Sequence, residues 1–165
     1  IINIVILKIF KLMIKHLPFL VLTLFFLSCE KDDICIEGSE NTNRVTIGFV
    51  NYKSRIQTGI SLSYIKGINN DSILSEGFSG DYLKLPLKVN SNQTRYILEH
   101  DKIKDTLKIF HQTNHLYLNR SCGFKSNFVI KSETEIEKES GWIREVSIEK
   151  DSIFNEENTN IFIYY

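Results

Sequence analysis

Apolar and polar residues alternate with a period of two from residue 44 onward, and this pattern constrains the fold more than any other feature of the sequence. The clearest example is residues 83–89, where leucines and a valine occupy every second position. Short strands joined by polar turns predict an all-β domain, a single antiparallel β-sandwich that is Ig-like in general architecture. The other expected strands are at residues 45–49, 60–64, 94–99, 105–111, 115–119, 122–130, 142–149 and 160–165.

Several local signals refine this expectation. Pro86 cannot donate to a strand ladder, so its strand should lie at a sheet edge or contain a bulge. Residues 112–114, Gln-Thr-Asn, are typical of a turn and predict a hairpin between the strands on either side. Residues 131–140 are rich in Glu and Lys and are expected to form a long exposed loop. The apolar strand at residues 161–165 should belong to the core, so removing it should damage folding.

The N-terminal residues have the composition of a targeting segment. Residues 17–28 form an uncharged apolar run that follows Lys15 and His16. About 20 apolar residues are needed to cross a bilayer as a helix, so this run is short for a membrane span and fits a signal peptide. We therefore assign residues 1–28 to a signal peptide, and a start at Met13 would give the most compact form of it. The alternative is that the same residues form one long anchor interrupted by lysines.

The residues that end the apolar run predict a lipid anchor. Residues 26–29, Phe-Leu-Ser-Cys, resemble a bacterial lipobox, in which the cysteine becomes the lipidated N-terminus. Cys29 is therefore the expected lipidation site, and the alternative is a free thiol that follows an apolar segment by chance. Several acyl chains on one residue would make the attachment to a membrane stable.

A charged segment, Glu30, Lys31, Asp32 and Asp33, follows the lipobox directly. One interpretation is a solvated tether. The other is that the segment resembles the export signal of surface lipoproteins in Bacteroidota, which would place the protein on the cell surface, with the periplasmic leaflet of the outer membrane as the alternative. We expect residues 29–43 to form a lipidated tether and residues 44–165 to form the β-sandwich domain.

The charge balance argues against a nucleic-acid partner. The chain contains 20 Lys and Arg and 20 Asp and Glu, but residues 1–28 contain lysines and no acid. The remainder of the chain is therefore mildly acidic. Binding to nucleic acid requires clustered basic side chains that replace counterions, and the sequence has no such basic stripe.

The cysteines predict a disulfide. If Cys29 carries lipid, Cys35 and Cys122 remain as an even pair in an oxidising compartment, where such pairs form bridges. The bridge would close a loop over residues 35–122 and tie the tether to the sheet. The sequence contains no CxxC pair and no Cys/His cluster with the spacing of a metal site, so we predict no metal and no cofactor.

No group of residues predicts an enzyme. His111 and His115 have a spacing that binds metal on a helix, but they flank a predicted hairpin turn and lack a third ligand. The sequence also lacks a glycine-rich phosphate loop and a Gly-x-Ser-x-Gly elbow. We therefore predict no catalytic residues, because the paired carboxylates lie in charged loops rather than in a cleft. These pairs are Glu133/Glu135, Glu137/Glu139 and Glu156/Glu157.

Two kinds of residue suggest contact with carbohydrate. Ser72 and Ser152 each stand between an aspartate and an isoleucine, which resembles the O-glycosylation acceptor of Bacteroidota; Asp-Ser also marks a turn that enters a strand. Trp142 and several tyrosines could form a platform that stacks on sugars, although aromatics in a sandwich are more often core residues. The tyrosines are Tyr52, Tyr64, Tyr82 and Tyr96.

Short segments in a fixed order resemble an uncharacterised lipoprotein family of Bacteroidota, whose members share a lipobox and a second cysteine, here Cys29 and Cys35. The resemblance implies a small outer-membrane lipoprotein with a domain of unknown function, whose relatives are often encoded near a predicted outer-membrane β-barrel. We therefore expect an accessory or structural subunit of a β-barrel complex, attached to the membrane by lipid. The alternative is a surface module that binds glycans or other ligands. The segments are residues 85–87, 94–98 and 105–107, Cys122-Gly123-Phe124, and residues 160–164.

Overall fold

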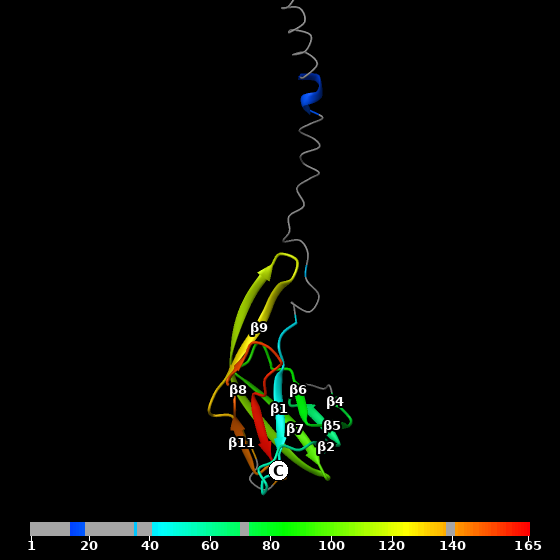
Figure 1. Cartoon of the computed structure of the whole chain (residues 1–165), viewed down its shortest axis with the longest axis vertical. Coiled ribbons are helices and arrows are strands. Elements are labelled where there is room, and N and C mark those ends of the chain that lie inside the picture. Colours follow the sequence, from blue (N-terminus) through cyan, green and yellow to red (C-terminus); the bar gives the residue numbers. More distant parts are fainter. Residues whose placement is uncertain (1–13, 19–34, 36–40, 70–72, 138–140) are drawn as a thin grey trace, which may run out of the picture.

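Strands form nearly all of the regular structure (Figure 1). The computed structural model describes residues 14–18, 35, 41–69, 73–137 and 141–165. Residues 14–18 are helical, and no helix in the described ranges has the length and apolar character needed to cross a bilayer. The predicted all-β class is confirmed. The strands are β1 (Val45–Val50), β2 (Ile60–Leu62), β3 (Tyr64–Gly67), β4 (Ile73–Ser75), β5 (Phe78–Gly80), β6 (Tyr82–Leu85), β7 (Gln93–His100), β8 (Ile103–Asn119), β9 (Gly123–Ile130), β10 (Glu135–Ile136), β11 (Glu145–Ile148), β12 (Ser152–Ile153) and β13 (Ile161–Tyr164).

The first sheet has the strand order β11-β13-β1-β6, so β1 and β13 are its central strands. Every residue of β1 is buried, as expected for a strand that is covered on both faces. β1 and β13 pair in parallel, with Ile47 opposite Ile161, whereas the other strand pairs among the described residues are antiparallel. The C-terminal strand therefore belongs to the core, as predicted, and one parallel pair departs from the antiparallel expectation.

Asn160 explains how the parallel pair is held in register. Its buried side chain accepts a hydrogen bond from the Thr46 N–H at Oδ1 (3.0 Å) and donates from Nδ2 to the carbonyls of Lys150 and Ser152. Its own N–H donates to the Thr46 carbonyl at 2.8 Å. Buried polar groups of this kind need partners, and here the partners fix the position at which β13 meets β1.

The second sheet has the order β12-β9-β8-β7-β3-β4, with β10 also paired to β8. A two-residue turn joins β7 to β8, and both of its residues, Asp101 and Lys102, have positive φ, as a type I′ turn requires. β2 and β5 pair as a separate two-stranded sheet, and the three sheets enclose one hydrophobic core. Its largest fully buried apolar side chains are Ile47, Phe49, Ile161 and Ile163 from the first sheet, Ile65, Leu98, Leu107, Ile109, Phe128 and Ile153 from the second, and Leu62 from β2.

The edge position expected for the strand at Pro86 is confirmed, but the strand predicted at residues 83–89 ends at Leu85 and does not include the proline. The residue follows directly after β6, which is the edge strand of the first sheet, so no ladder hydrogen bond from it is needed. Its carbonyl accepts a hydrogen bond from the buried hydroxyl of Tyr96 in the second sheet. The end of the edge strand is thereby attached to the facing sheet.

Some predicted boundaries are wrong. Residues 112–114 are not a turn, because β8 continues through them. These residues and their neighbours before and after them all pair with β9, with Thr113 opposite Phe128. Polar side chains are compatible with a strand that leaves the body and stands in solvent, so the turn signal was misleading. The loop expected at residues 131–140 contains β10, and Trp142 precedes β11 rather than lying in it.

The segment before β11 is attached to the core through Asp105. This buried carboxylate accepts a hydrogen bond from the Ile143 N–H at 2.7 Å, and the neighbouring Trp142 donates from Nε1 to the Leu98 carbonyl at 3.2 Å. Gly141 lies against the same carboxylate: a Cβ at this position would be 1.5 Å from Asp105 Oδ1. Only a glycine fits here without a displacement of the buried aspartate.

Candidate functional site

Hairpin β8–β9 extends beyond the body as an arm, which we define as residues 112–127 (Figure 1). β7 pairs with β8 only as far as Phe110, and β12 pairs with β9 only at Phe128 and Val129. Within the described structure the strands of the arm therefore pair only with each other. β8 contributes residues 112–119 to the arm and β9 contributes residues 123–127, so the longer strand makes the arm about 25 Å long. A two-stranded hairpin is marginally stable in water on its own, so further contacts must hold the arm.

The arm ends in a three-residue turn at residues 120–122, which Gly123 closes with a φ of 69°. Asn119 Oδ1 accepts a hydrogen bond from the Cys122 N–H at 2.6 Å. A glycine with positive φ after a three-residue loop is a common way to close a hairpin, because other residues are strained there. The sequence Asn-Arg-Ser-Cys-Gly carries this signal, which the strand predicted at residues 122–130 overlooked.

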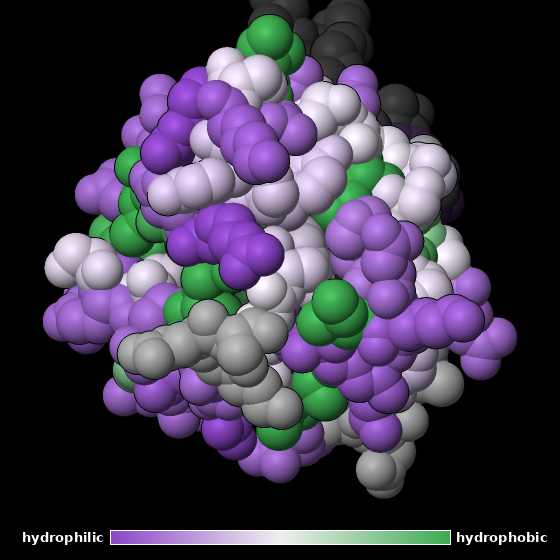
Figure 2. Space-filling view, turned by 90° about the horizontal axis from the view of Figure 1, so that it is seen from below, coloured by the Kyte–Doolittle hydropathy of each residue, from purple (hydrophilic) through white to green (hydrophobic). Residues whose placement is uncertain are grey.

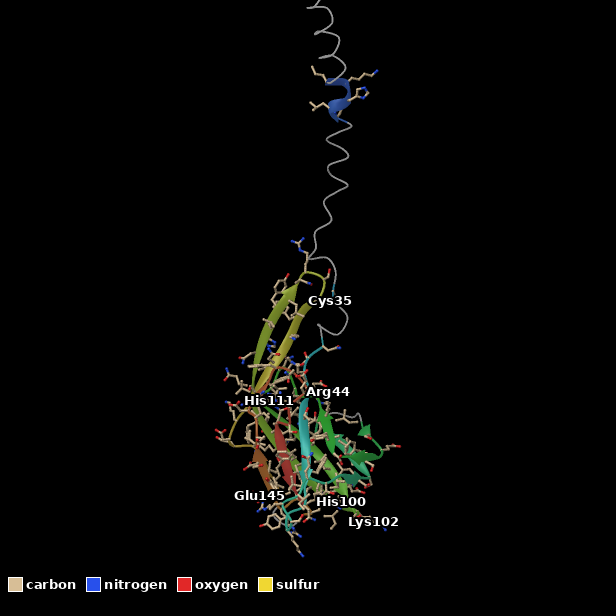
Figure 3. The ribbon with its side chains drawn as sticks, in the orientation of Figure 1. Cys35, Arg44, His100, Lys102, His111 and Glu145 are labelled. Atoms are coloured by element: carbon tan, nitrogen blue, oxygen red, sulfur yellow. A yellow bond between two sulfur atoms is a disulfide. The ribbon has the colours of Figure 1, made fainter. Side chains whose placement is uncertain are left out.

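A disulfide between Cys35 and Cys122 lies at the end of the arm, with the two Cα atoms 5.1 Å apart, and the predicted bridge is confirmed. It attaches the tether to the tip of the arm, where Figure 3 labels Cys35. The tether also binds the side of the arm: Thr42 Oγ1 accepts from the Ser126 N–H at 3.2 Å, and Asn43 Nδ2 donates to Asn127 Oδ1 at 3.2 Å. The arm is thus held at its tip by the disulfide and at its base by these two hydrogen bonds.

Apolar side chains are exposed near the tip on both faces of the arm. Tyr117 and Phe124 lie opposite each other across the two strands, with ring centroids 5.1 Å apart, and are 54% and 67% exposed. They occupy the face that continues into the buried side chain of Phe128. Leu116 lies on the other face and is 44% exposed. We call Leu116, Tyr117 and Phe124 the apolar tip, since clustered exposed apolar side chains mark interaction surfaces.

A polar hollow of about 600 Å³ lies at the base of the arm. Arg44 and Glu156 form a two-pronged ion pair across it, with N···O distances of 2.9 and 2.8 Å, and the Lys84 ammonium is 3.3 Å from the same carboxylate. The hydrogen bonds from Arg44 contribute most to lowering the pKa of Glu156 to about 2. The carboxylate is therefore ionised and its charge is balanced, so the ion pair joins the residue before β1 to the loop that follows β12. The hollow is lined by Asn41, Thr42, Asn43, Arg44, Lys84, Lys125, Asn155, Glu156 and Glu157.

The two predicted histidines lie in one strand, β8, so the hairpin turn expected between them is wrong. His111 is completely buried, with Nε2 2.9 Å from Thr94 Oγ1 and its ring edge-on to Phe128. Burial lowers the pKa of His111 to about 4, with a smaller effect from the charge of Lys131. His115 faces Ser126 Oγ at 3.1 Å. No three His, Cys, Asp or Glu side chains of the described ranges form a group that could hold a metal.

The buried His111 makes stability depend on pH. The folded protein keeps the imidazole neutral down to about pH 4, whereas the unfolded chain binds a proton near pH 6.5. Stability is therefore complete above pH 6.5 and falls as the pH drops toward 4, and we expect a loss of about 2–3 kcal/mol in the free energy of unfolding between pH 7 and pH 4.5. Urea unfolding at the two pH values measures this loss.

His111→Gln and His115→Gln provide matched variants for this measurement. In His111→Gln, the free energy of unfolding should differ less between pH 7 and pH 4.5 than in the wild type, whatever the effect of the substitution on stability at pH 7. In His115→Gln, this difference should be the same as in the wild type. Glu156 does not interfere, because its own stabilising effect is lost only below about pH 4.5. If His111→Gln lost as much stability between pH 7 and pH 4.5 as the wild type, His111 would not be the source of the pH dependence.

The remaining predicted sites are scattered rather than assembled. Ser152 lies in β12, half-buried, and pairs with Val129 at the edge of the second sheet. Glu135 and Glu137 form ion pairs with Lys108 and Arg95 at 3.2 and 3.1 Å, so they are salt-bridge partners. The predicted lipidation site, the predicted export signal and two further residues lie outside the described residues: Cys29, Glu30, Lys31, Asp32, Asp33, Ser72 and Glu139.

The aromatic residues divide between core and surface. Trp142 is 6% exposed and Tyr96 is also buried, so both are core residues. Tyr82 is 50% exposed, and Tyr52 is exposed with its ring 4.8 Å from the Arg55 guanidinium carbon. Burial of Trp142 removes the residue best suited to stack on a sugar from the proposed platform.

The fold and the site together define a small β-sandwich that carries a disulfide-stapled arm. A domain model described as a family of unknown function, DUF6452, matches residues 62–165, which is more than half of the chain. The protein therefore belongs to this family. The match includes the arm, Cys122 and Gly141, whereas β1 and Cys35 precede it. Comparison with curated proteins gave no match, and comparison with solved structures gave none.

Proposed function

We propose that this protein is an outer-membrane lipoprotein of Bacteroidota that serves as an accessory or structural subunit of a β-barrel complex. The observation that carries the proposal is the disulfide between Cys35 and Cys122, which ties the arm to the segment directly after Cys29. Disulfides are typical of exported proteins. Together with the lipobox, the bridge supports a lipid-anchored protein whose arm stays close to its anchor.

The charged segment Glu30-Lys31-Asp32-Asp33 supports a place on the outer face of the membrane, with the periplasmic leaflet as the alternative arrangement. It separates the lipidated cysteine from the stapled Cys35 and resembles the export signal of surface lipoproteins. The protein would thus be attached to the membrane by lipid and would not bind nucleic acid.

The state of the acidic side chains supports a structural role rather than an enzymatic one. An acid/base pair of the glycosidase type needs at least one carboxyl with a raised pKa. Glu156 has a lowered pKa instead, because Arg44 and Lys84 neutralise it. The observed ion pairs therefore support a scaffold held by electrostatic contacts at its surface.

Affinity purification from outer membranes in mild detergent tests the proposal. A tag inserted in the exposed turn at Asn90 leaves the arm and the C-terminal strand intact. We expect a β-barrel protein to co-purify in near-equal amount with the wild type. The Cys29→Ala variant should lose fatty-acid labelling, membrane retention and the partner together, because all three depend on the anchor.

The experiment tests the accessory role and the lipobox assignment separately. Purification of the labelled wild type without a barrel partner would contradict the accessory role. Fatty-acid labelling that persists in Cys29→Ala would contradict the lipobox assignment. The variant retains the Cys35–Cys122 bridge, so a folding defect is not expected to imitate either result.

A second candidate function, ligand binding, is favoured by a hollow of about 820 Å³ beside β2 and β5. Its hydroxyl groups and the half-buried ring of Phe78 offer hydrogen bonds and an apolar surface, which is the usual composition of a ligand site. If the protein purifies alone, glycan binding to this hollow is the next property to test, with Phe78→Ala as the variant. The lining residues include Ser61, Ser63, Ser79 and Glu99.

A further inference from the structure

We infer that the apolar tip of the arm enters the membrane interface beside the lipid anchor, so that the protein contacts the bilayer at two points. The inference rests on the proposed lipidation of Cys29. Cys29 and Cys35 are close in the sequence, and an extended chain between them spans at most about 20–22 Å. Because Cys35 is bonded to Cys122 in the turn of the arm, with their Cα atoms 5.1 Å apart, the anchor also holds the tip within about 25–27 Å of Cys29.

The arrangement of the exposed side chains favours a bilayer over a protein groove. Leu116 lies on one face of the arm, and Tyr117 and Phe124 lie on the other, at the same level near the turn. A protein groove would cover one face of a two-stranded ribbon, whereas a fluid interface surrounds both. Tyrosine is enriched at membrane interfaces, where an apolar ring and a polar hydroxyl are both accommodated.

The charge of the arm also favours a bilayer as the binding partner of the tip. Residues 112–127 include Arg120 and Lys125 and no Asp or Glu, although the domain as a whole is mildly acidic. Basic side chains next to an apolar tip can reach the phosphates of lipid headgroups while their stems remain in the interface. The arm thus combines exposed apolar side chains with a basic residue in the turn, Arg120, and another opposite Leu116, Lys125.

The opposite end of the body has a different surface. Figure 2 views this end, where polar residues cover most of the visible described surface and separate the apolar ones from each other. The C-terminal residue Tyr165 lies at this end, and its carbonyl accepts a hydrogen bond from the Tyr52 N–H at 2.8 Å. Tyr52 is therefore an exposed aromatic residue at the end of the body that is far from the apolar tip.

Quenching by brominated lipids tests the inference on the full-length lipidated protein. Trp142 is the only tryptophan and is buried in the body, so it provides a constant background. Phe124→Trp places a reporter at the tip, and Tyr52→Trp places a matched reporter on an exposed aromatic position at the other end. The proteins are reconstituted in vesicles of phosphatidylcholine and phosphatidylglycerol, with part of the phosphatidylcholine brominated on the acyl chains near the headgroup.

We expect the added emission of Phe124→Trp to shift to shorter wavelength on reconstitution and to be lost in brominated vesicles. The emission of the wild type and the added emission of Tyr52→Trp should be unchanged. Flotation and fatty-acid labelling of the same samples report the anchor independently. Floating, labelled protein with an unquenched Trp at position 124 would overturn the inference and leave the tip free for a protein partner, while the anchor would stand.

Two other outcomes would also overturn it. Equal quenching at positions 52 and 124 would show that the body lies against the membrane without a preference for the tip. A wild type that is neither labelled nor floating would remove the anchor on which the inference depends. Because Phe124 is exposed, its replacement by another aromatic residue should leave the fold intact.

Discussion

Replacing Cys35 and Cys122 together by serine should lower the free energy of unfolding by up to about 4–5 kcal/mol, because the bridge restricts a long loop in the unfolded chain. The two cysteines are separated by 87 positions, and loop-closure entropy grows with this separation. Urea unfolding followed by the fluorescence of the buried Trp142 measures the loss. Reduction of the wild-type protein should reproduce it.

The Cys29→Ala variant is the matched control for this prediction, since it removes a cysteine and retains the bridge. Amide exchange gives a second readout: without the disulfide, residues 112–127 should exchange much faster than the body, because the hydrogen bonds of Thr42 and Asn43 lie at the base of the arm and not at its tip. If the double variant were as stable as the control, the bridge would not constrain the unfolded chain as argued.

Gly141→Ala should lower the free energy of unfolding nearly as much as loss of the disulfide, by about 3–4 kcal/mol. The new Cβ would lie 1.5 Å from Asp105 Oδ1, so the buried carboxylate must move and its hydrogen bond to the Ile143 N–H is disturbed. Overpacking and a broken buried hydrogen bond each cost about 1–3 kcal/mol. Thermal or urea unfolding of the variant measures the loss.

Gly80→Ala is the control for this substitution, because its Cβ would be 3.3 Å from the ring of Phe78, a side chain that can shift slightly. The double variant Asp105→Ala/Gly141→Ala gives a further test. Removing the carboxylate removes the clash, so the two losses should be clearly less than additive. A Gly141→Ala protein as stable as Gly80→Ala would refute the packing argument.

The periodicity of the sequence was sufficient for the class of fold, and the missing N–H of Pro86 was sufficient to place its neighbouring strand at a sheet edge. Alternation reports which face of a strand is buried, and this local property does not depend on the partner strand. The parallel pairing of β1 with β13 could not be predicted in the same way. It depends on Asn160, whose buried hydrogen bonds join residues that are far apart in the chain.

The candidate site was predictable only in part. The number of cysteines predicted the disulfide. Once Cys29 is assigned to lipid, Cys35 and Cys122 can form a bridge within the chain only with each other. The arm was missed because the polar residues Gln112, Thr113 and Asn114 are typical of turns and here form part of a strand exposed to solvent. The same error separated His111 from His115 by a turn, although both project from one face of β8.

The parallel pair at the centre of the first sheet also has a kinetic consequence. Ile47 and Ile161 come from nearly opposite ends of the sequence of the folded body, so their contact closes a long loop. Contacts of such high sequence separation slow folding. Until β13 is inserted, β1 offers one unpaired edge to any other extended segment, including the β13 of a second molecule. The period before this sheet closes is therefore when the protein is most exposed to strand exchange and aggregation.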